Sequence, residues 1–195
     1  LYLLSDGEAV HIILENTPPQ TAGFKAYRRG PGEDEYRPLT LEAVRPVTDP
    51  YRAYELLGQD ARWLARKFDT ADPVRLWRKI EVNRSMAYAY ALVSPGLRMA
   101  LGRTLIDRSV EPGSAYRYRI TLIDRRGGEI RTVNRRVKVT SPEPPRQPKG
   151  VTARTSDRQV VVDWEYAPYR GGRADRTAAF HIFRRSADGT TERIN

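Results

Sequence analysis

The segment VEPGSAYRYRITLIDRRGGE, residues 110–129, carries the clearest structural pattern in the chain. Apolar side chains occupy every second position from Tyr116 to Leu122, and polar side chains separate them. This period of two predicts a β-strand with one buried face. A glycine pair follows, and the next stretch again alternates, so we expect a hairpin of two strands at about 116–124 and 129–139.

The composition fits a globular chain of one or two domains, with 195 residues, 39% hydrophobic and 30% charged. There is no cysteine, which excludes disulfides, thiolate metal sites and cysteine nucleophiles. No apolar run approaches the roughly 18–20 residues that a membrane-spanning helix needs. We therefore expect no membrane span.

A proline-rich stretch, SPEPPRQPKG, divides the sequence into two parts that begin alike. SDGEAVHIILENTP at 5–18 resembles SDRQVVVDWEYAP at 156–168, and the related strands FKAYRR and FHIFRR follow them. Proline lacks the donor that a sheet ladder needs, so the stretch predicts an extended linker. We expect a first domain at 1–140, a linker at 141–149 and a second domain at 150–195.

Residues at about 49–101 show helical rather than strand periodicity. Asp49–Pro50, Asp72–Pro73 and Ser94–Pro95 each combine an N-cap residue with a first-turn proline. Apolar residues recur at helical spacing after the first two pairs. We expect several short helices here, with their aromatic side chains either packed in a core or exposed as a recognition surface.

The strand at 116–124 and the residues before it resemble the fibronectin type III family. Pro112 and Gly113 match the sharp corner before the strand, and Tyr116 matches the conserved position of a tyrosine corner. Trp164 resembles the family's core tryptophan on the second strand. The resemblance implies a mainly β, immunoglobulin-like β-sandwich, with Tyr116 bonding backbone near the corner and its ring in the core.

Two departures from the family pattern accompany this resemblance. The helical segment at about 49–101 would be an insertion between strands, and the residues after 150 supply only the first strands of a second sandwich. A complete sandwich needs about seven strands in ~100 residues. We therefore expect a fragment of a longer protein, with possible dimer formation or strand swapping through the incomplete second domain.

No motif for an enzyme, nucleotide loop or metal site occurs in the sequence. His11 and His181 fall in separate predicted strands, and the acidic GEDE stretch at 32–35 is expected to be a solvated turn. The prediction is accordingly no enzymatic activity, no cofactor and no metal.

The net charge of +10 arises mostly from arginine, which outnumbers lysine 29 to 5. On three neighbouring strands of the expected sandwich, cations alternate with core residues and share one exposed face. These candidate binding residues are Lys25, Arg29, Arg117, Arg119, Arg136 and Lys138. The alternative is that carboxylates of the helical segment cover or neutralise this face.

The resemblance implies a non-catalytic binding or scaffold module of a larger bacterial protein that contacts protein or glycan. Such a module would be extracellular, on the cell surface or periplasmic. Two alternatives remain open: an accessory region of a secreted multidomain hydrolase, and a binder of polyanions or nucleic acid through the basic face. Protein or glycan is the favoured partner over nucleic acid.

Overall fold

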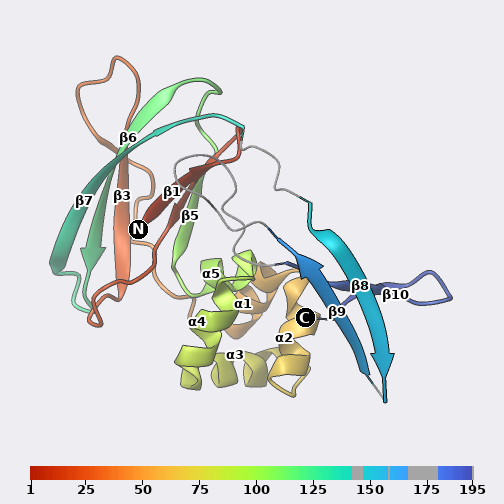
Figure 1. The fold of residues 1–195 in the computed structure, drawn as a ribbon. Coiled ribbons are helices and arrows are strands. Elements are labelled where there is room, and N and C mark those ends of the chain that lie inside the picture. Colours follow the sequence, from red (N-terminus) through yellow and green to blue (C-terminus); the bar gives the residue numbers. More distant parts are fainter. Residues whose placement is uncertain (142–146, 158, 167–179, 195) are drawn as a thin grey trace. The chain divides into compact units, whose positions relative to one another are not determined.

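The computed structural model describes residues 1–141, 147–157, 159–166 and 180–194. The chain divides into two compact units, one formed by 1–141 with 179–195 and the other by 142–178. The described residues are mainly β, with 35% in strands and 23% in helices, and the strands form several antiparallel sheets (Figure 1).

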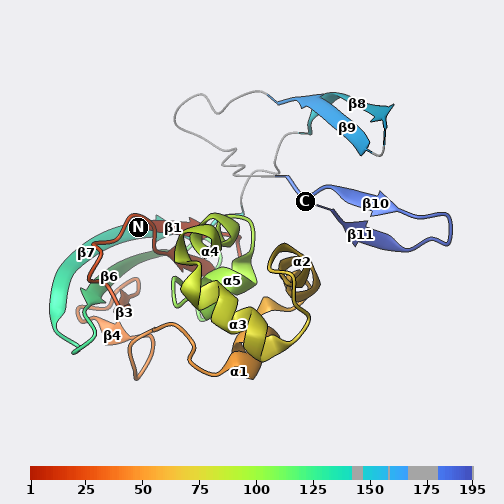
Figure 2. The same ribbon diagram turned by 90° about the horizontal axis from the view of Figure 1, so that it is seen from below.

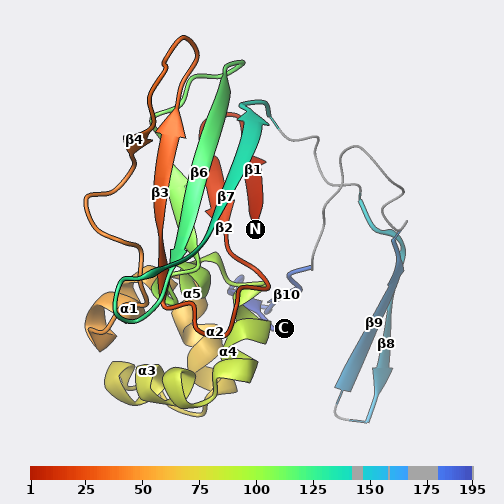
Figure 3. The same ribbon diagram turned by 90° about the vertical axis from the view of Figure 1, so that its left-hand side faces the viewer.

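The first unit contains the two larger of these sheets and the two-stranded sheet of β10 (Phe183–Arg185) and β11 (Thr191–Arg193). Of the two larger sheets, the smaller has the order β1-β2-β5 and the larger the order β4-β3-β6-β7, with all neighbours antiparallel (Figure 3). The predicted hairpin at 116–124 and 129–139 is confirmed as β6 and β7. The strands are β1 (Tyr2–Ser5), β2 (Val10–Ile13), β3 (Gly23–Arg29), β4 (Arg37–Pro38), β5 (Thr104–Asp107), β6 (Ala115–Ile123) and β7 (Glu129–Lys138).

The two larger sheets contribute side chains to one hydrophobic core, an arrangement compatible with a β-sandwich. Val10 and Ile12 of β2 are fully buried, as are Tyr118 and Ile120 of β6. Each pair is separated by one residue, because successive side chains of a strand point to opposite faces. Because Tyr118 and Ile120 of β6 point inward, Arg117 and Arg119, which alternate with the inward residues, point outward.

The corner before β6 has the tyrosine hydrogen bond that the family resemblance implies. The Tyr116 hydroxyl accepts a bond of 3.0 Å from the backbone N–H of Glu111, and the tyrosine is only 5% exposed. Gly113 has φ of 82°, a conformation that glycine adopts without a side-chain clash. Its N–H donates to the Val139 carbonyl at 2.8 Å, which attaches the corner to the residue after β7.

Five helices lie between β4 and β5 in the described chain (Figure 2). Asp49, Asp72 and Ser94 accept backbone N–H bonds at the starts of α1, α3 and α5, so the three predicted N-caps are confirmed. A cap of this kind stabilises a helix by about 1 kcal/mol. The helices are α1 (Pro50–Leu57), α2 (Asp60–Lys67), α3 (Pro73–Val82), α4 (Arg84–Ala91) and α5 (Pro95–Ala100).

The helices form a second hydrophobic core of their own. Trp63, Phe68 and Trp77 are each buried within it, and Tyr90 packs edge-on against the first two rings. Tyr88 differs, because it is 43% exposed. Most of the helical aromatic residues therefore pack in a core, and Tyr88 remains on the surface. None of the helices in the described ranges combines the length and the apolar character needed to cross a membrane.

A short hairpin of β10 (Phe183–Arg185) and β11 (Thr191–Arg193) contacts α2 within the first unit. Arg193 donates to Asp60 at 2.7 Å, with both side chains 10% exposed, and its guanidinium lies 4.2 Å from the Trp63 ring centre. Asp60 also accepts from the Ser94 hydroxyl at 2.6 Å. The hairpin thus supplies the cation for a carboxylate buried in the helical core.

The second unit contains an antiparallel hairpin of β8 (Lys149–Ser156) and β9 (Gln159–Glu165). Trp164, which we expected to be buried, lies in β9 and is half-buried. The strands that we assigned to one second domain thus fall into two units, since β10 and β11 belong to the first. Most of the predicted linker, 142–146, lies outside the described residues.

Candidate functional site: a basic sheet face and an arginine-lined groove

The register of the larger sheet brings the predicted cations onto one outward face. Arg29 of β3 lies opposite Arg117 of β6, and Arg117 lies opposite Arg136 of β7. Three arginines therefore form a row across three adjacent strands, which run side by side in Figure 3. Like charges directly opposite one another in a sheet are destabilising, so the row has a cost in the isolated chain.

The other three predicted cations flank this row on the same face. Arg119 follows Arg117 by two residues on β6, and Lys138 is opposite Ala115 near the other end of that strand. Lys25 is opposite Thr121, further from the arginine row. We call the outward side of these strands the basic sheet face, and define it by Lys25, Arg29, Arg117, Arg119, Arg136 and Lys138.

Tyr36 adds an aromatic ring to the basic sheet face that the sequence did not predict. The guanidinium groups of Arg29 and Arg119 lie 5.4 and 4.2 Å from its ring centre. Such contacts orient an arginine without neutralising its charge. Tyr36 follows the GEDE loop, and no periodic pattern indicates where a loop residue will pack.

Carboxylates of the helical segment do not neutralise the basic sheet face by direct ion pairs. Within the described ranges, none of its six cations has a carboxylate oxygen within the 4.0 Å that defines a salt bridge. Arg29 donates instead to the backbone carbonyl of Asp34 at 3.3 Å. Arg117, Arg119, Arg136 and Lys138 are exposed. The face therefore presents uncompensated positive charge to solvent.

Arg28, the neighbour of Arg29, points to the opposite side of β3. Its Nη1 donates to both carboxylate oxygens of Asp107 at 3.1 and 3.0 Å, and Tyr118 donates its hydroxyl proton to the same group at 2.8 Å. Burial raises the pKa of Asp107, but hydrogen bonds from Ser109 and Tyr118 and the charge of Arg28 outweigh it, so the net pKa is lowered. The charge of Arg28 is therefore compensated by the buried carboxylate of Asp107, whereas the charge of Arg29 has no carboxylate partner in the described chain.

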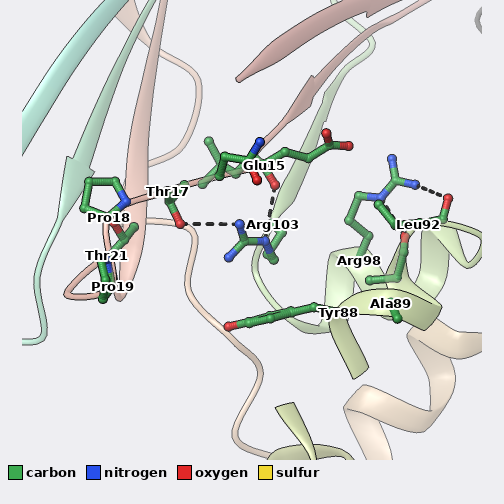
Figure 4. Close-up of a pocket in the computed structure, with 13 residues that line it drawn as sticks. Glu15, Thr17, Pro18, Pro19, Thr21, Tyr88, Ala89, Leu92, Arg98 and Arg103 are labelled. Atoms are coloured by element: carbon green, nitrogen blue, oxygen red, sulfur yellow. Dashed lines mark hydrogen bonds between the residues drawn. The ribbon is translucent and has the colours of Figure 1, made fainter. Parts of the chain in front are cut away.

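Two adjoining cavities lie between the helices and the loops and turns of the two larger sheets. The first has a volume of about 450 Å³ and lies between the loop after β2 and helices α4 and α5. Arg103 donates to the Leu14 carbonyl at 3.2 Å and to the Thr17 hydroxyl at 3.3 Å, and its guanidinium is 4.8 Å from the Tyr88 ring centre (Figure 4). These contacts hold the arginine on the cavity wall.

Arg98 lies in the wall of the same cavity (Figure 4). It donates to the carbonyls of Ala91 and Leu92, both at 3.0 Å, and so satisfies acceptors at the end of α4. Burial lowers the pKa of the Arg98 guanidinium, while the charge of Glu15 opposes that shift. Arg98 is thus a partly desolvated cation that no carboxylate in the described chain contacts at ion-pair distance.

The second cavity, of about 650 Å³, shares Pro19, Thr21 and Tyr88 with the first. Its wall includes the hairpin turn between β6 and β7 and the helices α3 and α4. Four more arginines line it. We call the two cavities together the arginine groove, defined by Arg45, Arg84, Arg98, Arg103, Arg125 and Arg126.

The two histidines and the acidic loop have local partners. His11 bonds Asp6 at 2.8 Å, and this contact is the main cause that lowers the Asp6 pKa to about 2. His181 bonds the Val93 carbonyl at 3.1 Å, and Glu33 accepts from the Gly30 N–H at 2.7 Å. In the described residues, no group of three or more metal-binding side chains is placed to hold a metal ion.

The predicted structural positions are Tyr116, Pro112 and Gly113 at the corner of the first unit and Trp164 in the second unit. The predicted binding residues share one face, whereas the arginine groove was not predicted, because its cations come from loops and helix ends far apart in the sequence.

No family model matches the chain, and no curated protein matches it.

Proposed function

We propose that this chain is a non-catalytic binding module that holds an acidic partner, an anionic glycan or an acidic protein segment, on its basic sheet face. The observation that carries the proposal is the row Arg29, Arg117 and Arg136. These arginines lie opposite one another in register and have no carboxylate partner in the described chain. A bound anion would offset their mutual repulsion.

The spacing of the face suits a linear polyanion. Adjacent strands lie about 4.8 Å apart, and alternate residues of a strand lie about 6.6 Å apart. Repeated carboxylate or sulfate groups of an extended chain can match such a grid, and arginine binds both groups through paired N–H donors. Tyr36 holds two of the arginines in place, which reduces the entropy lost on binding.

The resemblance to fibronectin type III domains supports a binding rather than a catalytic role. The Tyr116 corner bond and the three- and four-stranded sheets around one core are compatible with such a sandwich. We further propose, from this resemblance alone, that the helices are an insertion into the domain and that the protein is exported in a bacterium, at the surface or in the periplasm. Fold similarity does not identify the ligand.

Charge reversal tests the proposed function. The full-length chain with Arg117→Glu and Arg136→Glu should lose about tenfold or more in affinity for a sulfated glycan such as heparin. The remaining binding should also depend less on salt, because fewer counterions are released. Isothermal titration at several salt concentrations measures both quantities, and duplex DNA serves as a second polyanion probe.

The matched control is Arg78→Glu with Arg131→Glu, which changes the net charge equally on exposed residues outside the basic sheet face. The control should bind the glycan nearly as the wild type does. Equal losses in both variants would show that only overall charge matters, and would overturn the proposal. Tighter binding of DNA than of glycan would favour the nucleic-acid alternative.

A further inference from the structure

The arginine groove is a second cluster of cations, and it shares no residue with the basic sheet face. Six arginines and three carboxylates line its two cavities, so the lining has a net charge of +3. One of the three carboxylates, Asp124, already accepts N–H bonds of 2.8 Å from Arg126 and from Gly128 in the hairpin turn. The groove is therefore a concave and strongly positive surface.

The cavity volumes match those of small-molecule sites. Sites for such ligands typically occupy about 300–1,000 Å³ and combine apolar walls with a few polar groups. Tyr88, Leu101 and Trp77 contribute apolar surface to the larger cavity. The groove thus has room for a ring as well as for an anionic group.

Two of the arginines in the smaller cavity are held in place before any ligand arrives. Arg103 is fixed by two hydrogen bonds and by the Tyr88 ring, and Arg98 by two backbone carbonyls. Each uses its Nε and one Nη for these contacts, which leaves Nη1 available. Preorganised donors lose little conformational entropy when they bind an anion.

Unsatisfied polar atoms add an independent indication. Four buried side-chain polar atoms of the described residues have no hydrogen-bond partner, and two of them, Thr21 Oγ1 and Trp77 Nε1, belong to residues that line the larger cavity. A buried donor without an acceptor carries a free-energy cost. A ligand with several acceptor oxygens, once the wall adjusts to it, could offset that cost.

We propose that the arginine groove binds a small phosphate-bearing molecule with an attached ring, of the nucleotide or sugar-phosphate class. Phosphate fits better than a single carboxylate, because several arginines surround the groove and a phosphate offers three terminal oxygens to them. The ring lies against Tyr88 and Leu101. No covalent step is implied.

Calorimetric titration of the full-length chain tests the proposal with four probes: adenosine monophosphate, glucose 6-phosphate, adenosine and inorganic phosphate. At least one of the two organic phosphates should bind in a one-to-one ratio. Adenosine should not bind, and inorganic phosphate should bind at least about tenfold more weakly, since it lacks the ring contacts. Failure of both organic phosphates, or equal affinity for inorganic phosphate, would overturn the proposal.

Two double variants test whether the organic phosphate binds in the arginine groove. Arg84→Ala with Arg125→Ala removes one exposed cation from α4 and one from the hairpin turn, and should weaken binding of the organic phosphate at least about tenfold. The control, Arg78→Ala with Arg131→Ala, removes one cation from a helix and one from the hairpin outside the groove, and should bind as the wild type does. Equal weakening in both variants would refute a site in the groove.

The sheet-face variant separates this proposal from the proposed function. Arg117→Glu with Arg136→Glu should reduce glycan affinity and leave binding of the organic phosphate nearly unchanged. If instead this variant abolishes phosphate binding while Arg84→Ala with Arg125→Ala does not, the phosphate binds on the basic sheet face and the groove proposal is wrong.

Discussion

At the scale of single residues, two neighbours in the sequence can lie in opposite environments. Arg28 and Arg29 are adjacent, yet one lies in a buried network with Asp107 and the other lies on the basic sheet face. The alternation of a strand imposes this separation, because successive side chains point to opposite faces. Arg28 has Asp107 as its carboxylate partner and is structural, whereas Arg29 has no carboxylate partner in the described chain and can bind a ligand.

The tyrosine corner gives a prediction at this scale. Tyr116→Phe removes the hydroxyl that accepts from the Glu111 N–H, and should lower the free energy of unfolding by about 1 kcal/mol. Urea unfolding of the full-length chain measures the change. Tyr27→Phe is the control, since Tyr27 is a half-exposed residue on the outward side of β3. Equal stability of the two variants would show that the corner bond contributes nothing.

Asp107 gives a pH-dependent prediction. Its pKa is lowered in the folded chain from the ordinary value of 3.8, so its stabilising contribution is fully present above about pH 4 and is lost as the pH falls through the lower folded value. Asp107→Asn should therefore destabilise the chain most at neutral pH, with a smaller difference from wild type near pH 2. Urea unfolding between pH 2 and 7 measures this; a difference independent of pH would contradict it.

At the scale of elements, two ion pairs join α2 to the hairpin of β10 and β11, and the pair of Asp60 with Arg193 is the more buried of the two. Asp60 and Arg193 are each 10% exposed, and their separation in sequence is 133 residues. Removing one partner of a buried pair leaves the other charge without compensation. The helices and the hairpin should therefore be coupled in stability.

Arg193→Ala tests this coupling. It should destabilise the helical core by about 3 kcal/mol and increase amide hydrogen exchange in both α2 and the hairpin. Arg185→Ala is the control, because Arg185 is an exposed residue of the same hairpin and forms no ion pair with the described residues. Exchange that rises only in the hairpin would show that α2 does not depend on it.

At the scale of the whole molecule, the sequence predicted features whose causes are local. The N-caps at Asp49, Asp72 and Ser94 lie within three residues of their partners, and the hairpin of β6 and β7 follows from alternation and a glycine turn. Strand period also predicted that Arg117 and Arg136 lie on the outward side of their hairpin. Each of these inferences needs only a few neighbouring residues, whereas the expectation that β3 lies beside β6 came from the family resemblance, because the two strands are far apart in the sequence.

Features that depend on distant segments were not predictable in the same way. The pairing of Arg193 with Asp60 has no periodic pattern, and neither has the packing of Tyr36 between Arg29 and Arg119. The arginine groove combines residues from loops, helix ends and a hairpin turn, whose sequence positions carry no shared signal. A single sequence indicates which elements form, whereas their assembly determines the cavities between them.

The position of β7 has a consequence for aggregation. This strand lies at the edge of the larger sheet, and on one side of its backbone no strand of the described residues pairs with it, so that side can pair with a strand of another molecule. Arg131, Arg135, Arg136 and Lys138 give the strand four positive charges, which would repel an identical edge. Two of these cations, Arg136 and Lys138, belong to the basic sheet face, so they would hold an acidic partner and also help to keep copies of the chain apart. A bound polyanion would reduce that repulsion and allow chains to associate edge to edge along it.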